Sequence, residues 1–256
     1  MPFKTLLISL LVIGLSCDHK DLTPAPREAA GMPVNPYPSI GEIPLPEGFE
    51  RTPSIPNSFA AYLRNTGLKK DKTVYLYNGK EKRYQHAQFA VLDITVGDRD
   101  LQQCADAVMR LRAEYLYTQK KYDSLVFFDN DKRPYRFQPP YTRERFSSYL
   151  DKVFGMCGSA SLSRQLKPAA DPDHIQPGDV LIRGGFPGHA ALVMDVAANK
   201  KGDRIYLLAQ GYMPAQDIHI LRNPANRSLS PWYALTEANT ITTPEYIFYR
   251  NEFRSW

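Results

Sequence analysis

Nine prolines interrupt residues 18–57, and this spacing constrains the fold more than any other feature of the sequence. Proline fixes its own φ angle and lacks a backbone N–H group, so closely spaced prolines exclude a regular helix or a central strand. We therefore expect residues 18–57 to form a semi-extended tether. Residues 58–256 are left for the folded part, a length that suits one domain with its own hydrophobic core.

The first 17 residues have the layout of a signal peptide. Lys4 is followed by an apolar run from Leu6 to Leu15, about half the length of a membrane-spanning helix. The residues that end at Cys17 resemble a bacterial lipobox, in which a lipid is attached to the cysteine. That resemblance implies a lipid-anchored protein of the bacterial cell envelope. A plain secretory signal, in which Cys17 is incidental, remains the alternative.

The distribution of charge disfavours some classes of function. The formal net charge is +5, and the lysines and arginines are scattered among acidic residues. Such basic groups are typical of a solvated surface rather than of a nucleic-acid site. His86, His174 and His219 show no spacing typical of metal ligands. We therefore expect no nucleic-acid partner, no metal and no other cofactor.

Hydrophobic periodicity predicts both helices and strands. Apolar residues recur at helical spacing over residues 101–117 and 143–154. An Asn-Gly turn at 78–79 predicts a hairpin over 73–84. Further strands are expected at residues 89–94, 179–182, 189–197 and 204–210. This mixture indicates an α+β domain.

The segment 177–193 carries the most informative motif. Gly178-Asp179 leads into one expected strand, and Gly188-His189 leads into the next. Glycine before the histidine lets the backbone approach the imidazole closely. The segment resembles the histidine half of NlpC-type and CHAP-type cell-wall peptidases and amidases. The resemblance implies a papain-like α+β fold, in which a helix that carries a cysteine packs on an antiparallel sheet.

Cys104, at the start of the helix expected over 101–117, matches the nucleophile of those enzymes. A helix N-terminus favours the thiolate form of a cysteine. The resemblance implies that His189 acts as the general base and that Gln210 orients its ring. It also implies an oxyanion site made by the backbone N–H of Cys104 and the side chain of Gln103. The cysteine segment departs from the enzymes' pattern, because Gln103 stands where they have aspartate.

Taken whole, the chain resembles a family of uncharacterised bacterial lipoproteins, the domain of unknown function 4846. The stretches that carry this resemblance are residues 102–112, 184–189 and 209–216. The resemblance spans most of the expected folded part and implies no particular activity.

Three functions follow from these patterns. The first is a thiol hydrolase that cleaves a cell-envelope amide, such as a peptidoglycan stem peptide, through Cys104, His189 and Gln210. The second is a non-catalytic envelope lipoprotein that binds peptide or glycan, which a disulfide between Cys104 and Cys157 would favour. The third is an assembly partner, which a large exposed apolar patch away from these residues would support.

Overall fold

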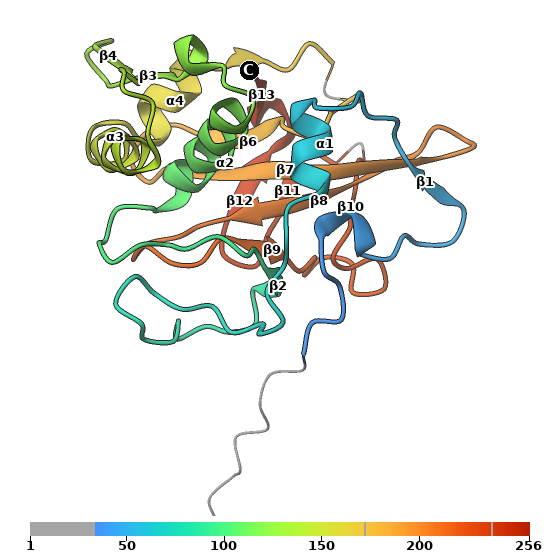
Figure 1. Ribbon diagram of the computed structural model, residues 1–256. Helices are drawn as coiled ribbons and strands as arrows, with labels where there is room; N and C mark the ends of the chain where they lie inside the picture. The colour runs from blue at the N-terminus through green and yellow to red at the C-terminus, as the bar shows by residue number, and fades with distance from the viewer. Residues whose placement is uncertain (1–33, 172, 237) are drawn as a thin grey trace, which may run out of the picture. The chain divides into compact units, whose positions relative to one another are not determined.

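The computed structural model of the protein describes residues 34–171, 173–236 and 238–256 (Figure 1). The expected signal peptide, Cys17 and residues 18–33 of the expected tether lie outside these ranges. None of the helices described has the length and apolar character needed to cross a membrane.

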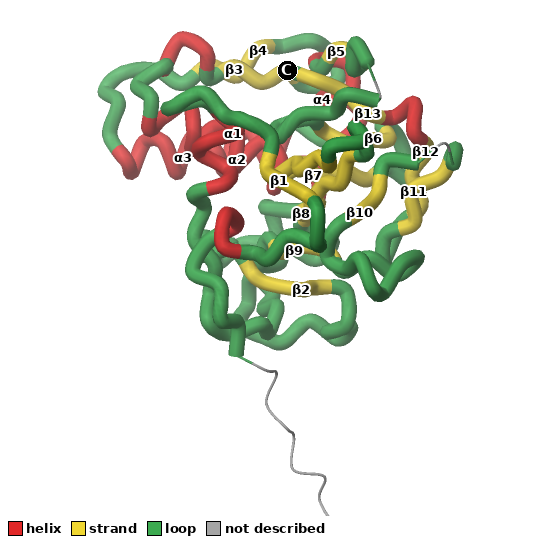
Figure 2. Tube along the Cα trace, turned by 90° about the vertical axis from the view of Figure 1, so that its right-hand side faces the viewer, coloured by secondary structure: helices red, strands yellow, loops and turns green. Residues whose placement is uncertain are grey.

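Within the described residues, a nine-stranded sheet forms the centre of the domain, and Figure 2 shows its strands edge to edge. The strand order is β2-β9-β8-β7-β6-β13-β5, with β1 paired to β7 and β10 paired to β8. Every pairing in this sheet is antiparallel. The strands are β1 (Phe49–Arg51), β2 (Gln88–Val91), β5 (Lys167–Pro168), β6 (Val180–Arg183), β7 (His189–Asn199), β8 (Arg204–Gln210), β9 (His219–Leu221), β10 (Tyr233–Ala234) and β13 (Phe253–Ser255).

Two separate hairpins and a small set of helices complete the described chain. The hairpins pair β3 (Val126–Phe128) with β4 (Pro134–Arg136), and β11 (Thr240–Thr242) with β12 (Ile247–Tyr249). Ser58 and Thr142 cap two of the helices, since each hydroxyl accepts a hydrogen bond from a free backbone N–H of the first turn. The helices are α1 (Phe59–Arg64), α2 (Cys104–Thr118), α3 (Arg143–Met156) and α4 (Ser159–Gln165), with 3-10 turns η1 (Ile40–Glu42), η2 (Tyr122–Ser124) and η3 (Arg250–Glu252).

Apolar side chains cover both faces of the sheet. On one face, Leu192 and Met194 of β7 belong to a core that also contains the buried residues of α1, α2 and α3. On the other face, Val193 packs in a second core with Phe248 of β12. Successive strand residues point to opposite faces, so β7 serves both cores. Figure 1 shows α1 and α2 in front of β7 and β8, with β11 and β12 behind.

The architecture is mainly β, which corrects the papain-like α+β class that we predicted. Helices account for 23% of the structure, and the antiparallel sheet dominates it. A class that gives the cysteine-bearing helix and the sheet equal weight therefore does not describe this domain, in which the sheet dominates. The sequence pattern emphasised the two long amphipathic helices, and it did not reveal β5, β9, β10 or β13. Strands of two or three residues are too short to show a period-2 alternation.

Residues 34–57, which we expected to be part of the tether, pack against the domain. Ile40 and Ile43 are fully buried, and β1 pairs with the end of β7. Arg51, together with Arg64 of α1, pairs with the buried carboxylate of Asp195 in β7 at 2.7 and 2.6 Å. Prolines exclude long regular elements here, but they leave the apolar side chains between them free to be buried.

Candidate functional site

A cavity of about 380 Å³ lies at the N-terminus of α2. Cys104, the first residue of α2, and His189, the first residue of β7, both line it. The loop before β7 contributes Phe186, and the loop after β8 contributes Tyr212. The structure therefore brings two of the sequence-predicted site residues to one cavity. The third, Gln210, is fully buried, does not line the cavity, and contacts Nε2 of His189.

Hydrogen bonds anchor the start of α2 beside this cavity. The backbone N–H of Gln103 donates to Oδ2 of Asp106 at 3.0 Å. Oδ1 of Asp100 accepts from Nε2 of Gln103 at 3.1 Å and from the backbone N–H of Ala215 at 2.7 Å. Asp100 thereby ties the loop after β8 to the helix start. Gln103, predicted for the oxyanion site, lines the cavity with its amide nitrogen already donating one hydrogen bond.

A buried polar network orients His189. Its Nε2 atom lies 2.7 Å from Oε1 of Gln210. Nε2 of Gln210 donates to Oε2 of Glu245 at 2.7 Å, and Nζ of Lys82 donates to the same oxygen at 2.6 Å. Glu245 therefore holds the Gln210 amide with its oxygen toward the imidazole. An amide oxygen only accepts, so neutral His189 carries its proton on Nε2 and leaves Nδ1 as an acceptor.

Burial keeps His189 uncharged. Desolvation lowers the pKa of His189 from 6.5 to about 4. The positive charge of Lys82 also lowers this pKa, whereas the hydrogen bond with Gln210 raises it. Aromatic rings supply much of the desolvation. The rings of Tyr212 and Tyr246 lie 5.0 Å from the imidazole centroid, and that of Phe248 lies at 5.7 Å. The neutral imidazole has a free acceptor at Nδ1, and its pKa of about 4 makes it a weak base near neutral pH.

The thiol of Cys104 is also neutral at rest. Burial, followed by the charge of Asp106, raises its pKa, while the backbone N–H groups of Ala105 and Ala190 act in the opposite direction. The helix N-terminus favours a thiolate, whereas burial of the thiol acts in the opposite direction and raises its pKa. Across the described residues, no hydrogen bond joins Cys104 to His189.

One comparison with known proteins gives a result. The family model for the domain of unknown function (4846) matches residues 41–139 and 129–255. The chain belongs to this family. Cys104, His189 and Gln210 all fall inside the matched range, and so does the whole cavity that we describe. No curated protein and no solved structure matches the chain.

Two thiols, rather than a disulfide, face the cavity of this family domain. Cys104 and Cys157 are both free and both line it. Burial, followed by the charges of Asp106 and Asp129, raises the pKa of Cys157 to about 12. Cys157 is therefore the less reactive of the two. In the described ranges, no three His, Cys, Asp or Glu side chains are arranged to hold a metal ion.

Sequence reasoning missed two members of the His189 network. Glu245 lies in a loop before β12, and Lys82 follows the Asn-Gly turn; nothing in their sequence context marks them. His219, for which the sequence indicated no role, is fully buried in β9. Its Nδ1 donates to the backbone carbonyl of Asp217 at 2.9 Å, and its Nε2 lies 3.5 Å from Nε2 of Gln210. The pairing of β8 with β9 places His219 opposite Gln210, and side-chain hydrogen bonds bring Glu245 and Lys82 into the same network.

Proposed function

We propose that this protein is a thiol hydrolase that cleaves an amide bond, with peptides of the bacterial cell wall as its substrate class. The observation that supports this proposal most is the shared cavity of Cys104 and His189, with the histidine held by Gln210 and Glu245. A nucleophile, a base and a group that orients the base are the minimum set for covalent acyl transfer.

The reaction starts from a neutral pair. The Cys104 Sγ–H gives its proton to Nδ1 of His189 as sulfur attacks the amide carbonyl, and a tetrahedral oxyanion forms. The imidazolium then protonates the leaving amine as the C–N bond breaks, which leaves a thioester. Water hydrolyses the thioester with His189 again as base, and the thiol is regenerated. Substrate binding is expected to shorten the Cys104–His189 separation, as often happens from free to bound states.

Two groups are proposed to stabilise the oxyanion. Cys104 is the first residue of α2, so its backbone N–H has no acceptor within the helix, and we propose that it donates to the oxyanion. The Gln103 side chain lines the cavity next to it, anchored by Asp100. The helix N-terminus therefore contributes in the transition state, where charge develops, although it does not ionise the resting thiol.

The same proposal places the protein in the cell envelope. Cleavage of the signal peptide before Cys17 and lipidation of that cysteine would anchor the chain to a bacterial membrane. Residues 18–33 would then separate the lipid from the packed residues that begin at 34. A cell-wall peptide is a substrate that a protein anchored in this way would meet.

Peptidoglycan digests provide the direct test. Wild-type protein is expected to release new amine and carboxyl ends from stem peptides, as detected by mass spectrometry. Cys104→Ala and His189→Ala should abolish the release, while Cys157→Ala, which changes the other thiol of the cavity, should retain it. Equal turnover by Cys104→Ala and wild type would exclude the thiol mechanism.

A non-catalytic binder of peptide or glycan is the second candidate. The observation in its favour is the raised pKa of Cys104, together with the missing hydrogen bond to His189 in the described chain. It predicts that the digest components bind to wild type and to Cys104→Ala with equal affinity and that neither protein converts them. That pair of results would replace the hydrolase proposal.

A further inference from the structure

An open cavity of about 540 Å³ adjoins the thiol cavity. Its lining comes from α4, from the end of β6 and the loop that follows, from η3 and from β13. Ala160 and Gly185 line both cavities, so a single ligand can extend from one into the other. Figures 1 and 2 both show α4 beside β6, at this end of the sheet. The proposed mechanism uses none of the charged residues of this second cavity.

The lining of this cavity is strongly basic. It contains three arginines but a single carboxylate, and these residues are Arg164, Arg183, Arg254 and Glu252. Glu252 forms a fork with Arg183, in which its two oxygens accept from Nε at 2.6 Å and from Nη2 at 3.0 Å. The same carboxylate accepts from the backbone N–H of Tyr249 at 2.8 Å. The carboxylate is therefore already occupied by Arg183.

Arg164 and Arg254 keep N–H groups that a ligand can use. Nη2 of Arg164 donates to Oδ1 of Asn130 at 2.6 Å. Nη1 of Arg254 donates to the backbone carbonyls of residues 251 and 253 at 2.8 and 2.9 Å. A guanidinium has more donors than these bonds use, and among the described residues neither arginine has a carboxylate partner. Arg164 is exposed and Arg254 is partly exposed, so solvent and ligand reach both.

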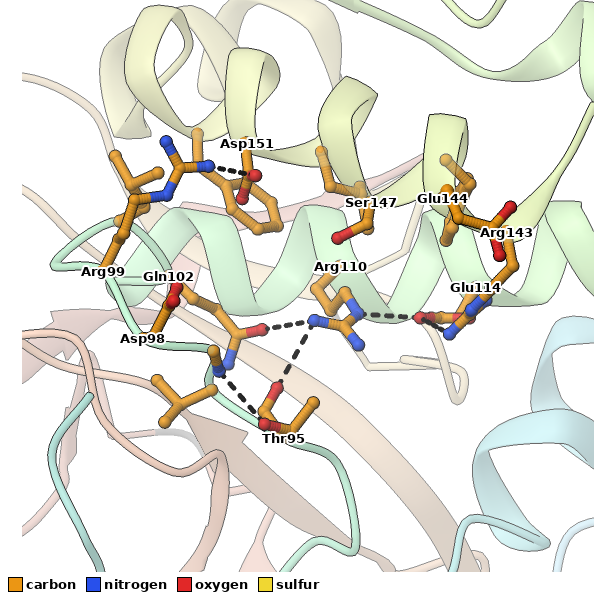
Figure 3. A pocket seen from close by; sticks show the side chains of 16 residues that line it. Thr95, Asp98, Arg99, Gln102, Arg110, Glu114, Arg143, Glu144, Ser147 and Asp151 are labelled. Carbon is orange, nitrogen blue, oxygen red and sulfur yellow. Dashed lines mark hydrogen bonds and ion pairs between the residues drawn. The ribbon is translucent and has the colours of Figure 1, made fainter. Parts of the chain in front are cut away.

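The cavity between α2 and α3 has the opposite arrangement (Figure 3). There, Glu114 accepts from Arg110 at 2.8 Å and from Arg143 at 2.6 Å. Arg99 pairs with Asp151. Each arginine that lines that cavity has a carboxylate partner, so an anionic ligand would have to compete with a bound carboxylate. The cavity beside α4 is therefore the better site for an anion.

A carboxylate is the anion that the surroundings favour. The planar fork of a guanidinium matches the two oxygens of a carboxylate, which accept parallel N–H bonds. The adjoining thiol cavity is proposed to hold a peptide amide, and an unmodified peptide carries its negative charge only as carboxylates. These lie at its C-terminus and on its acidic side chains.

We propose that Arg164 and Arg254 bind a carboxylate of the substrate peptide while the amide to be cleaved lies against Cys104. This inference rests on the proposed function and adds a specificity to it. Peptides with a free carboxylate close to the cleaved bond are preferred over neutral peptides of the same sequence.

The test measures the binding of soluble stem peptides to Cys104→Ala, which lacks the nucleophile. The peptides come from a peptidoglycan digest and are used in native form and with all carboxyl groups converted to amides. Native peptides should bind about tenfold more tightly than amidated ones, because amidation removes the charge-assisted hydrogen bonds. Counterparts of the tightest-binding peptide, amidated only at the C-terminus or only on the side chain, identify which carboxylate is bound.

Two arginine variants in the Cys104→Ala background assign the site. Arg164→Gln and Arg254→Gln should each weaken the binding of native peptides about threefold, as expected for partly exposed ion pairs, and should leave the binding of amidated peptides unchanged. Arg145→Gln is the matched control, because Arg145 is an exposed arginine of α3 that lines neither cavity. It should bind both forms as the parent does.

Four outcomes would overturn the carboxylate site. They are no binding by the folded protein, equal affinity for native and amidated peptides, parent-like binding of native peptides by both arginine variants, and an equal loss for native and amidated peptides in those variants. Turnover by wild type separates this inference from the hydrolase proposal. Equal cleavage of native and amidated peptides retains the thiol mechanism and refutes the carboxylate site. Carboxylate-dependent binding without any cleavage retains the site and refutes the hydrolase.

Discussion

Glu245 determines which atom of the Gln210 amide faces the imidazole, although it lies 35 positions further along the chain. A carboxylate accepts only, so it binds the NH2 end of the amide and turns the oxygen toward His189. Lys82, buried beside Glu245, supplies the counter-charge that makes a buried carboxylate tolerable. The proposed acid–base role of His189 therefore depends on residues that do not line the cavity.

The ionisation of Cys104 gives the first prediction. Because burial raises its pKa, alkylation by iodoacetamide should be slow at pH 6 and should accelerate as the pH rises past 9. Cys157, with a pKa of about 12, should label more slowly at every pH. Mass spectrometry of the two cysteine peptides gives both rates. A rate for Cys104 that is already at its plateau at pH 6 would instead indicate a thiolate–imidazolium pair.

At the scale of elements, close backbone contacts position the cavity. Gly211 follows the last residue of β8, and a Cβ there would lie 2.8 Å from the carbonyl oxygen of Gln103 and 3.1 Å from Cβ of Ala107. Gly188 makes a similar approach, because a Cβ at that position would lie 2.4 Å from Oγ of Ser159. Because these two positions have no side chain, the start of β7 packs directly against α4 and the end of β8 packs directly against α2.

Gly211→Ala gives the second prediction. The added methyl group has to displace the backbone at the start of α2, which should lower the free energy of unfolding by about 1–3 kcal/mol. Gly155→Ala is the matched control. Gly155 lies inside α3 with no atom near its would-be Cβ, so alanine there should raise stability by about 0.5–1 kcal/mol. Urea unfolding of both variants measures the difference, and equal effects would contradict the close contact.

At the scale of the whole molecule, two buried histidines make the free energy of unfolding depend on pH. Burial lowers the pKa of His189 to about 4 and that of His219 to about 3, against an ordinary value of 6.5. Between pH 6.5 and the lowered pKa values, the unfolded chain binds protons that the folded chain does not. The two histidines therefore leave the free energy of unfolding at its full value above pH 6.5 and decrease it as the pH falls toward 3. Each unit of such a shift corresponds to about 1.4 kcal/mol.

His219→Gln isolates one part of this effect and gives the third prediction. The variant should lose less stability than wild type between pH 7 and pH 4.5, as measured by urea midpoints at both values. His86→Gln changes an exposed histidine outside the network and should follow wild type. If the His219→Gln and wild-type curves fall in parallel, the buried imidazole of His219 does not carry the acid sensitivity.

Membrane attachment gives the fourth prediction. If Cys17 carries a lipid, wild-type protein should partition into the detergent phase of a Triton X-114 separation. Cys17→Ala should remain uncleaved or appear in the aqueous phase. Cys157→Ala controls for loss of an unrelated cysteine. A correctly processed wild type found only in the aqueous phase would remove the anchor from the proposed function.

Local sequence patterns determined the long elements. Residues 101–117 and 143–154 repeat apolar side chains at helical spacing, and the structure has α2 and α3 there. The long strands β7 and β8 also lie where strands were expected, at residues 189–197 and 204–210. In such segments the pattern repeats often enough to be read from the chain alone. The Gly-His motif also directed attention to His189, whose catalytic role stays a prediction.

Only the tertiary structure decided the fold class, the burial of residues 34–57 and the environment of Cys104. Short edge strands form because neighbouring strands offer hydrogen-bond partners, and no local pattern records that. Glu245 and Lys82 reach Gln210 through contacts between segments that are distant in sequence. The pKa of a thiol depends on everything packed around it, whereas the sequence near Cys104 displayed only the helix end. Desolvation is a property of the assembled core, so it could not be predicted from the chain alone.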